Sequence, residues 1–214
     1  MTQPQGFLAT PTSGAGPGVL VLHAWWGLND TMKALCTRLA EAGFTAVAPD
    51  LYHGKLADTI PDAEILGRAL NANHVQAQAE IARAVTFLNE RAGPGKGIAV
   101  LGFSLGAAYA LDLAAADPDH IRSVVLYYGN GSADHSKSRA AYLGHFAEKD
   151  GFEPREGVDE LEGLLRQAGR PVTFHHYSGV GHWFAEPDRA DAYNKPAADL
   201  AWDRTLAFLK TQSA

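Results

Sequence analysis

The pentapeptide Gly102-Phe103-Ser104-Leu105-Gly106 constrains the fold of this chain more than any other stretch. It follows an apolar, strand-like run at 98–101 and precedes an alanine-rich run at 107–114 that is typical of a helix. The two glycines let strand and helix approach closely, so that the serine sits in a strained turn with its hydroxyl exposed. The alternative is a glycine-rich turn without chemistry. The flanking strand and helix favour a nucleophilic serine, with helix N–H groups facing any anion formed beside it.

Composition and charge exclude several classes of protein. The chain has 214 residues, 46% hydrophobic and 20% charged, which is ordinary for a single globular domain spanning 1–214. The net charge of −6 comes without a Lys/Arg cluster, so neither nucleic acid nor a membrane surface is an expected partner. We find no signal-peptide pattern and no spanning apolar run, and we expect a cytoplasmic protein. The single cysteine, Cys36, excludes an internal disulfide and is expected to be buried in a helix.

Strand-like and helix-like segments alternate along the whole chain. The strands are expected at 7–9, 18–23, 44–48, 98–101, 121–128, 141–147 and 171–177. The helices are expected from Asn29 or Asp30 to Gly43, at 61–71, 74–91 and 107–114, around 158–165, and at 196–210.

Two details of these helices can be specified. The glycine-rich run 93–97 is expected to end the third helix. The last helix is expected to turn Ala198, Trp202, Leu206 and Leu209 inward. The alternation as a whole predicts a mostly parallel sheet with helices on both faces, which binds ligands beyond the carboxyl ends of its strands.

A nucleophilic serine needs a histidine to take its proton and a carboxylate to orient that histidine. In α/β hydrolases, the fold class that this strand–turn–helix pattern predicts, the acid and then the histidine follow the serine along the chain. Asp150 ends the strand at 141–147 and precedes a glycine, so it fits the acid better than Asp134 or Asp159. His182 follows the last strand beside glycines and is expected to be the base.

The other histidines are assigned structural roles, and neither a metal site nor a cofactor is expected. His23 ends an early strand that faces the site, and its role is left open between packing and support behind the catalytic residues. His175 and His176 are neighbours on a strand and point to opposite faces, so they cannot chelate one metal together. The remaining histidines are His145, expected to be packed, and His53, His74, His120 and His135, expected in solvent.

Acyl transfer also needs N–H donors for the oxyanion. The N–H of Leu105 follows the nucleophile directly, and the N–H of Trp25 lies in a loop after an early strand, so these two are the expected donors. Three aromatic residues and an acid are expected to line the substrate pocket: Trp26, Phe103, Trp183 and Glu186. For Trp26, core packing is an equal alternative.

Several segments resemble the dienelactone hydrolase family, in the family's own order. They are Leu22-His23-Ala24-Trp25-Trp26-Gly27-Leu28-Asn29, Pro49-Asp50-Leu51-Tyr52, the serine pentapeptide, Phe146-Ala147-Glu148-Lys149-Asp150, Tyr177-Ser178-Gly179-Val180-Gly181-His182-Trp183-Phe184, and Ala201-Trp202-Asp203-Arg204-Thr205-Leu206-Ala207-Phe208-Leu209. The resemblance implies a compact α/β hydrolase without a separate cap domain, which works without a metal or an organic cofactor.

The chain departs from the family pattern at three positions. The best-known members carry a cysteine where this chain has Ser104, and a glutamate at the position that matches Ala24. The third departure is Glu186, which stands where an arginine of the chlorocatechol-pathway enzymes holds the substrate carboxylate. The family pattern therefore implies hydrolysis, while a carboxylate at this position is expected to repel an anionic substrate.

The leading hypothesis is a serine hydrolase of small carboxylic esters or lactones. A thioesterase or an acyl-peptide hydrolase would use the same triad, because these reactions differ only in pocket contacts. A non-catalytic small-molecule binding protein is the alternative from another class, since fold alone does not guarantee activity. The oligomeric state is left open, with a monomer favoured.

Overall fold

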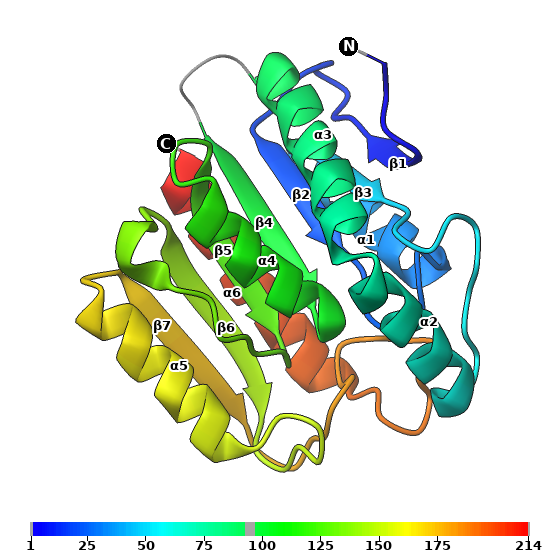
Figure 1. Ribbon diagram of the computed structural model, residues 1–214, viewed down its shortest axis with the longest axis vertical. Helices are drawn as coiled ribbons and strands as arrows, with labels where there is room; N and C mark the ends of the chain where they lie inside the picture. The colour runs from blue at the N-terminus through cyan, green and yellow to red at the C-terminus, as the bar shows by residue number, and fades with distance from the viewer. Residues whose placement is uncertain (1, 93–96, 214) are drawn as a thin grey trace. The chain divides into compact units, whose positions relative to one another are not determined.

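The computed structural model describes residues 2–92 and 97–213, in two compact units, Met1–Val100 and Leu101–Ala214. The strands are β1 (Gly6–Ala9), β2 (Gly18–Leu22), β3 (Thr45–Pro49), β4 (Ile98–Phe103), β5 (Ile121–Tyr127), β6 (Ala141–Ala147) and β7 (Val172–Tyr177) (Figure 1). The helices are α1 (Asp30–Glu41), α2 (Ile60–Ala72), α3 (His74–Ala92), α4 (Leu105–Ala116), the short 3-10 helix η1 (His135–Lys137), α5 (Arg155–Gln167) and α6 (Lys195–Ser213).

The expected strands and helices are all present, with bounds that differ by a few residues. Residues 93–96 of the expected helix-ending run lie outside the described part of the chain. A single domain spanning 1–214 stays a prediction.

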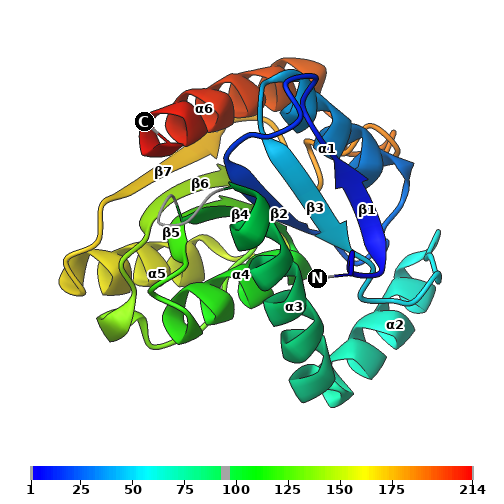
Figure 2. The same cartoon turned by 90° about the horizontal axis from the view of Figure 1, so that it is seen from above.

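In the first unit, β3 pairs with β1 in antiparallel and with β2 in parallel. β2 and β3 are buried along their whole length, which explains why their sequences are continuously apolar and not alternating. Helices flank these strands, with α1 on one face and α3 on the other (Figure 2).

Local signals explain where the helices of the first unit begin. The Asn29 side chain caps α1 by accepting a hydrogen bond from the Met32 N–H at 3.1 Å. Thr59 caps α2 in the same way, and Pro61 lies in the first turn of that helix. Cys36 is buried on α1, as predicted. Ile81, Val85 and Leu88 form the buried face of α3.

In the second unit, the strands lie in the order β4-β5-β6-β7, and β6 pairs in parallel with both β5 and β7. Figure 2 shows α4 and α5 on one face of these strands and α6 on the other. Because parallel strands of one sheet end at the same edge, the turns after β4, β6 and β7 lie together. These turns carry Ser104, Asp150 and His182.

A buried polar network ties α6 to three strands of the second unit. The Thr205 hydroxyl lies 2.8 Å from the Tyr127 hydroxyl and 3.0 Å from His145 Nε2, and His145 Nδ1 lies 2.8 Å from the Tyr177 hydroxyl. Burial above all holds the pKa of His145 well below its ordinary value, so the ring is neutral at pH 7. The packed role predicted for His145 is confirmed.

The inward face of α6 differs in part from the prediction. Leu209 is buried as predicted, whereas Ala198, Trp202 and Leu206 are half-buried, and the other buried residues are Ala201 and Thr205. The helix is rotated toward Thr205 because that hydroxyl bonds to two strands, a contact that apolar periodicity does not reveal.

Candidate active site

The turn between β4 and α4 holds Ser104 at φ 50° and ψ −115°, a conformation that residues other than glycine rarely adopt. A Cβ at Gly102 would lie 2.5 Å from the Gly106 carbonyl oxygen and 2.6 Å from Ala107 Cα. Only glycine therefore permits this approach of strand to helix, as the sequence predicts. The Ser104 N–H donates to the Tyr127 carbonyl at 2.9 Å, which fastens the turn to β5.

Three side chains from three turns of the second unit meet at this serine. Ser104 Oγ lies 2.9 Å from His182 Nε2, and His182 Nδ1 lies 2.7 Å from Asp150 Oδ2. A hydroxyl, an imidazole and a carboxylate in this series can move the serine proton to the histidine while the carboxylate stabilises the imidazolium. The structure thus brings together the three residues that the sequence singles out.

Asp150 is held as an anion by its hydrogen-bond donors. Besides His182, the backbone N–H groups of Phe152 and Glu153 donate to its Oδ1 at 2.9 and 3.0 Å. Burial by itself would raise the pKa of Asp150. The hydrogen bond and charge of His182, with these two N–H groups, outweigh burial and lower that pKa below its ordinary value.

The loop that carries His182 is shaped by unusual backbone conformations. Gly179 has φ 72°, and its N–H donates to the Glu148 carboxylate at 3.0 Å, which links this loop to the turn that carries Asp150. Trp183 has φ 63° although it is not a glycine, and such strain persists only where the surroundings hold it. His182 itself is 5% exposed.

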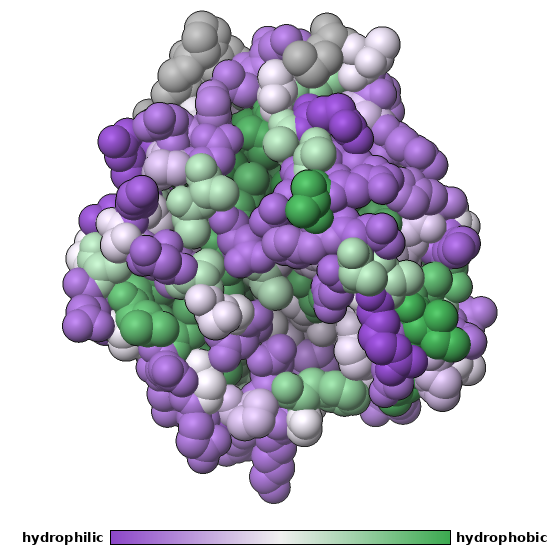
Figure 3. Space-filling model, in the orientation of Figure 1, coloured by the Kyte–Doolittle hydropathy of each residue, from purple (hydrophilic) through white to green (hydrophobic). Residues whose placement is uncertain are grey.

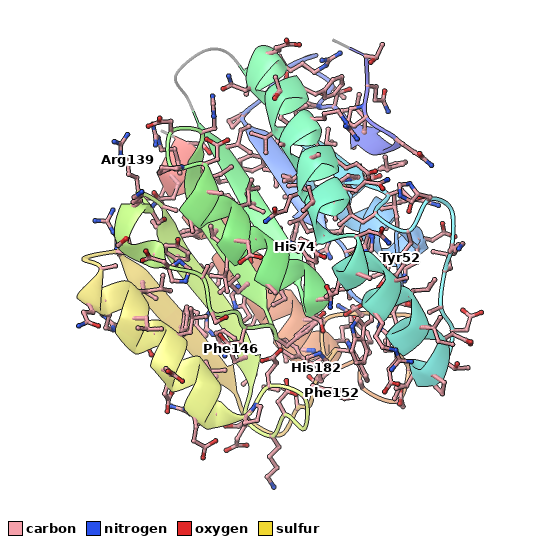
Figure 4. All side chains as sticks on the ribbon, viewed as in Figure 1. Tyr52, His74, Arg139, Phe146, Phe152 and His182 are labelled. Carbon is pink, nitrogen blue, oxygen red and sulfur yellow. The ribbon has the colours of Figure 1, made fainter. Side chains whose placement is uncertain are left out.

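Aromatic rings surround the imidazole of His182, among them those of Trp183 and Phe152. The Trp183 ring lies 4.8 Å from it and is buried, whereas the Phe152 ring lies 5.0 Å from it and is 45% exposed. Figure 4 labels His182 and Phe152 side by side. Trp183 therefore lies beside the triad, and its role in lining the substrate pocket stays a prediction. Sequence reasoning missed Phe152, whose only signal is its position two residues after Asp150.

Phe103 does not line an open pocket, contrary to expectation. It is 3% exposed, and its ring stacks on that of Tyr127 with centroids 4.5 Å apart. The strained turn at Ser104 exposes the serine while the preceding side chain stays in the core. A residue that sequence reasoning missed, Gly129, lies against the turn at Ser104, where a Cβ would collide with the Ser104 carbonyl oxygen.

Glu186 also differs from the expectation of a pocket-lining carboxylate. It is fully buried, and its Oε1 accepts a hydrogen bond from the Tyr128 hydroxyl at 2.9 Å. Burial raises the pKa of Glu186 to about 8, although the Tyr128 hydrogen bond lowers it and the nearby Asp188 and Arg189 act in opposite directions. At pH 7 this carboxyl is mainly neutral and does not face solvent, so it cannot repel an anionic substrate as expected.

Trp25, one of the two predicted oxyanion donors, and Trp26, a predicted pocket residue, lie in the first unit. Trp26 is 2% exposed, which favours its alternative role in the core. The indole of Trp25 lies against α2, where its Nε1 would be 3.1 Å from a Cβ at Gly67. Leu105 is the first residue of α4, a position whose N–H has no partner within the helix. The N–H groups of Trp25 and Leu105 as oxyanion donors stay predictions.

His23 directly follows β2 and is buried in the first unit. His23 is 1% exposed, its Nδ1 lies 2.8 Å from the Ala24 carbonyl oxygen, and its ring meets Tyr52 edge-on. Burial lowers the pKa of His23, and the Ala24 carbonyl and the Asp50 charge offset this only in part. The ring is therefore mainly neutral at pH 7, and a supporting role behind the catalytic residues stays a prediction.

One histidine differs from expectation. His135, expected in solvent, is 4% exposed. His175 and His176 contact different neighbours, as predicted for side chains on opposite faces of a strand. The His175 ring stacks near the His145 ring and the His176 ring near the Phe146 ring, each with centroids 5.9 Å apart. Of the other histidines expected in solvent, His53 and His120 are exposed and His74 is half-buried.

Residues 2–92 and 97–213 contain no group of three or more His, Cys, Asp or Glu side chains that could hold a metal ion. Among the helices of this part of the chain, none combines the length and the apolar character needed to cross a membrane. The face drawn in Figure 3 is mainly hydrophilic, with hydrophobic residues in small separate patches.

Comparison with known proteins points in the same direction as the geometry. The model of the dienelactone hydrolase family matches residues 5–213. The chain is 37% identical over 216 residues to Protein usf of Aquifex pyrophilus, covering 96% of this chain and 92% of that protein. It is 33% identical over 220 residues to an Aquifex aeolicus protein named "Putative carboxymethylenebutenolidase", covering 97% of this chain and 93% of that protein.

A solved structure of similar fold is that of a protein from Klebsiella pneumoniae named "Putative Dienelactone Hydrolase". It is 25% identical to this chain, with a TM-score of 0.80, and the match covers 92% of this chain and 89% of that one. The predicted fold class, an α/β-hydrolase fold, is confirmed by this likeness.

Proposed function

Because this chain belongs to the dienelactone hydrolase family, we propose that it hydrolyses small carboxylic esters or lactones through an acyl-enzyme formed on Ser104. The observation that carries the proposal is the hydrogen-bonded series from Ser104 Oγ through His182 to Asp150, with distances of 2.9 and 2.7 Å. Membership of the family supports hydrolysis, and this series supports serine as the nucleophile.

In the first half-reaction, Ser104 Oγ attacks the carbonyl carbon of the substrate while His182 Nε2 takes the hydroxyl proton. The negative charge that develops on the carbonyl oxygen is stabilised by the N–H groups of Leu105 and Trp25, each donor contributing about 3 to 4 kcal/mol. Asp150 keeps Nδ1 of His182 protonated and stabilises the imidazolium. His182 then protonates the leaving alkoxide, and the acyl group stays on Ser104.

In the second half-reaction, a water molecule replaces the alcohol. His182 takes a proton from this water, whose oxygen attacks the acyl carbon, and the proton then returns to Ser104 Oγ as the carboxylic acid leaves. A lactone follows the same steps, except that its alcohol remains tethered to the acyl group. None of these steps needs a metal ion or an organic cofactor.

The position of Glu186 bears on the class of substrate. Since this carboxyl is buried and mainly neutral at pH 7, it neither attracts nor repels a charged substrate strongly. Selection for or against an anionic lactone therefore depends on other groups. We propose neutral, short-chain esters and lactones as the substrates, with the rings of Phe152 and Trp183 beside His182 offering apolar contact to them.

The direct kinetic test is Ser104→Ala with p-nitrophenyl acetate as substrate. We expect kcat to fall by about 10⁵-fold or more, because nothing else in the series can form the acyl-enzyme. Ser138→Ala is the control, since Ser138 is buried outside the triad and its hydroxyl bonds to the Tyr142 hydroxyl and to the Ala140 N–H. Turnover by Ser104→Ala within tenfold of wild type would rule out the proposed nucleophile.

A panel of p-nitrophenyl esters, small lactones, acyl-CoA thioesters and acyl peptides separates the proposed activity from the alternatives. We expect the highest kcat/KM for short esters or lactones. A preference for thioesters or acyl peptides above tenfold would transfer the proposal to a thioesterase or an acyl-peptide hydrolase. Binding without turnover of any substrate would favour a non-catalytic binding protein.

Two further parts of the proposal concern the protein in the cell. We propose that it acts in the cytoplasm as a monomer on small molecules, without nucleic acid or membrane partners. Light scattering on a size-exclusion column tests the monomer, because a mass twice that of the 22.8 kDa chain would show a dimer.

A further inference from the structure

Three consecutive residues at the end of β5 contact both reacting groups of the site. The Tyr127 carbonyl accepts the hydrogen bond of the Ser104 N–H at 2.9 Å, and Gly129 lies directly against the Ser104 backbone. Between them, the Tyr128 ring packs on the His182 imidazole, with centroids 5.1 Å apart and planes at 59°. This short segment therefore sets where the nucleophile and the base lie relative to each other.

The Tyr128 side chain is fixed at both ends. Its backbone has φ 37°, in the left-handed region, and its N–H donates to the His145 carbonyl at 2.8 Å. Its hydroxyl donates to Glu186 Oε1 at 2.9 Å. The ring also meets Phe184 edge-on at 5.4 Å. The segment from His182 to Glu186 thus closes around one tyrosine ring, with contacts at its first, third and fifth residues.

This hydrogen bond lies in a dry environment. Tyr128 and Glu186 are both 0% exposed, so water cannot replace either partner when the bond is broken. Glu186 Oε2 is buried as well, and it has no hydrogen-bond partner among the described residues. An ionised carboxylate with a single hydroxyl donor would be poorly compensated here, whereas a neutral acid with its proton on Oε2 still accepts at Oε1.

The protonation states agree with this geometry. Burial raises the pKa of Glu186 to about 8, and burial raises the pKa of Tyr128 well above its ordinary value. The charged or titratable groups that act on Glu186 are the Tyr128 hydroxyl from the end of β5 and, from its own turn, Asp188 and Arg189. At pH 7 the tyrosine is a donor and the carboxyl a neutral acceptor, so the contact places no charge beside His182.

We propose that Tyr128 and Glu186 form a clasp that positions the His182 imidazole against Ser104, as positioning residues outside the chemistry itself. The proposal rests on the proposed serine-hydrolase function, because the clasp matters only if His182 is the base. It assigns Glu186 to the support of the catalytic histidine, in place of the substrate contact expected from the sequence. Above about pH 8 the clasp contains a buried anion, which disfavours the closed segment and lowers the rate.

The test measures kcat and KM for p-nitrophenyl acetate, with active sites counted by complete reaction with diisopropyl fluorophosphate. Per active site, we expect Tyr128→Phe and Glu186→Leu each to lower kcat about tenfold or more, with KM within about twofold of wild type. The double variant should be no slower than the slower single variant, because both remove one interaction. Glu186→Gln keeps an acceptor for the Tyr128 hydroxyl and should restore most of the kcat that Glu186→Leu loses.

Tyr142→Phe is the matched control for the tyrosine, since it removes another buried hydroxyl hydrogen bond, the one to Ser138, outside the site. It should keep the wild-type kcat per active site even if it loses stability. If the clasp had a purely structural role, Tyr128→Phe and Glu186→Leu would behave like this control, with wild-type kcat per active site and lower stability. Wild-type kcat per active site, within twofold, in those two variants would overturn the proposal.

The pH profile is the second readout, and it holds even if Glu186→Leu fails to fold. In the wild type, kcat should fall above about pH 8, and Glu186→Gln should abolish that fall because an amide does not ionise. Glu153→Gln is the control, since burial and then the Asp150 charge raise the pKa of Glu153 to about 7. It should leave the fall near pH 8 in place.

An unchanged alkaline fall in Glu186→Gln would overturn the proposal. Failure of the proposed function is a different result: the wild type would then form no adduct on Ser104 with the fluorophosphate, which overturns both proposals together.

Discussion

Two buried carboxyl groups flank the His182 segment, and their surroundings drive them to opposite protonation states. Asp150, in the turn after β6, accepts from His182 Nδ1 and from two backbone N–H groups, and its pKa is lowered. Glu186, four residues after the histidine, accepts from the Tyr128 hydroxyl alone among the described residues, and its pKa is raised to about 8. Burial acts in the same upward direction on both groups.

The difference therefore comes from the donors. Three N–H donors, one of them on an imidazole that becomes charged, more than offset the cost of burying the Asp150 anion, whereas one hydroxyl does not offset it for Glu186. The same fold thus supplies a carboxylate that orients the histidine and a neutral acid that can fix a loop without adding charge. Such divergence between neighbouring carboxyl groups is common where a site needs both roles.

The largest effect is expected where the anion is removed. Asp150→Asn should lower kcat/KM for p-nitrophenyl acetate by about 10⁴-fold, because an amide neither stabilises the imidazolium nor selects the productive tautomer of His182. Asp134→Asn is the matched control, since Asp134 is exposed and caps η1 through the Ser136 N–H. A loss below about 100-fold for Asp150→Asn, or an equal loss for both variants, would remove Asp150 from its proposed role.

The neutral state of Glu186 should change how the free energy of unfolding depends on pH. Glu186 has an ordinary pKa of 4.5 and about 8 in the folded protein, so between these values the folded state keeps a proton that the unfolded state has released. Wild-type stability should therefore fall relative to Glu186→Gln as pH rises from 5 to 8, by about 1.4 kcal/mol per pH unit at most, and level off above. Urea unfolding of both proteins at four pH values measures this difference.

Asp150 should show the opposite slope below about pH 4, when urea unfolding compares wild type with Asp150→Asn. Its pKa is lowered in the folded protein, so the stability it contributes is present above its ordinary value of 3.8 and lost as pH falls through the folded pKa. Stability curves of wild type and Glu186→Gln that stay parallel between pH 5 and 8 would contradict the neutral state of Glu186.

The smallest effect is expected from the exposed ring beside the triad. Phe152→Ala keeps the backbone N–H that donates to Asp150 but removes the ring from His182 and Trp183. If the N–H donors hold Asp150 as an anion, kcat should fall only about three- to tenfold, the size of a lost aromatic contact. Leu164→Ala, another exposed apolar residue, is the control. A loss approaching that of Asp150→Asn would mean that shielding by the ring matters more than the donors.

The sequence is informative about the site where local rules apply. The glycines around Ser104 predict the close turn that the structure contains, because a Cβ at Gly102 has no room. Asp150 and His182 can be singled out because each follows a strand of the parallel sheet and lies beside glycine. Chain order and turn chemistry are thus enough to nominate all three residues.

The sequence is uninformative where a side chain depends on a distant partner. The hydroxyl that meets Glu186 comes from Tyr128, 58 positions earlier in the chain, and no local pattern marks the pair. The inward rotation of α6 likewise follows from Thr205, which bonds to Tyr127 78 positions earlier. The position of Phe103 next to the serine predicts a place in the pocket, but the strained turn directs neighbouring side chains to different sides and leaves Phe103 in the core.

The most direct test of the central claim is covalent labelling of the wild-type chain with a fluorophosphonate, followed by peptide mass spectrometry. Phosphonylation requires a serine activated by its histidine, so we expect one adduct, on the peptide that contains Ser104, and none in the Ser104→Ala variant. Slower labelling of Asp150→Asn would agree with the role of the acid. A folded wild-type protein that gives no adduct, or an adduct on a different serine, would contradict the account.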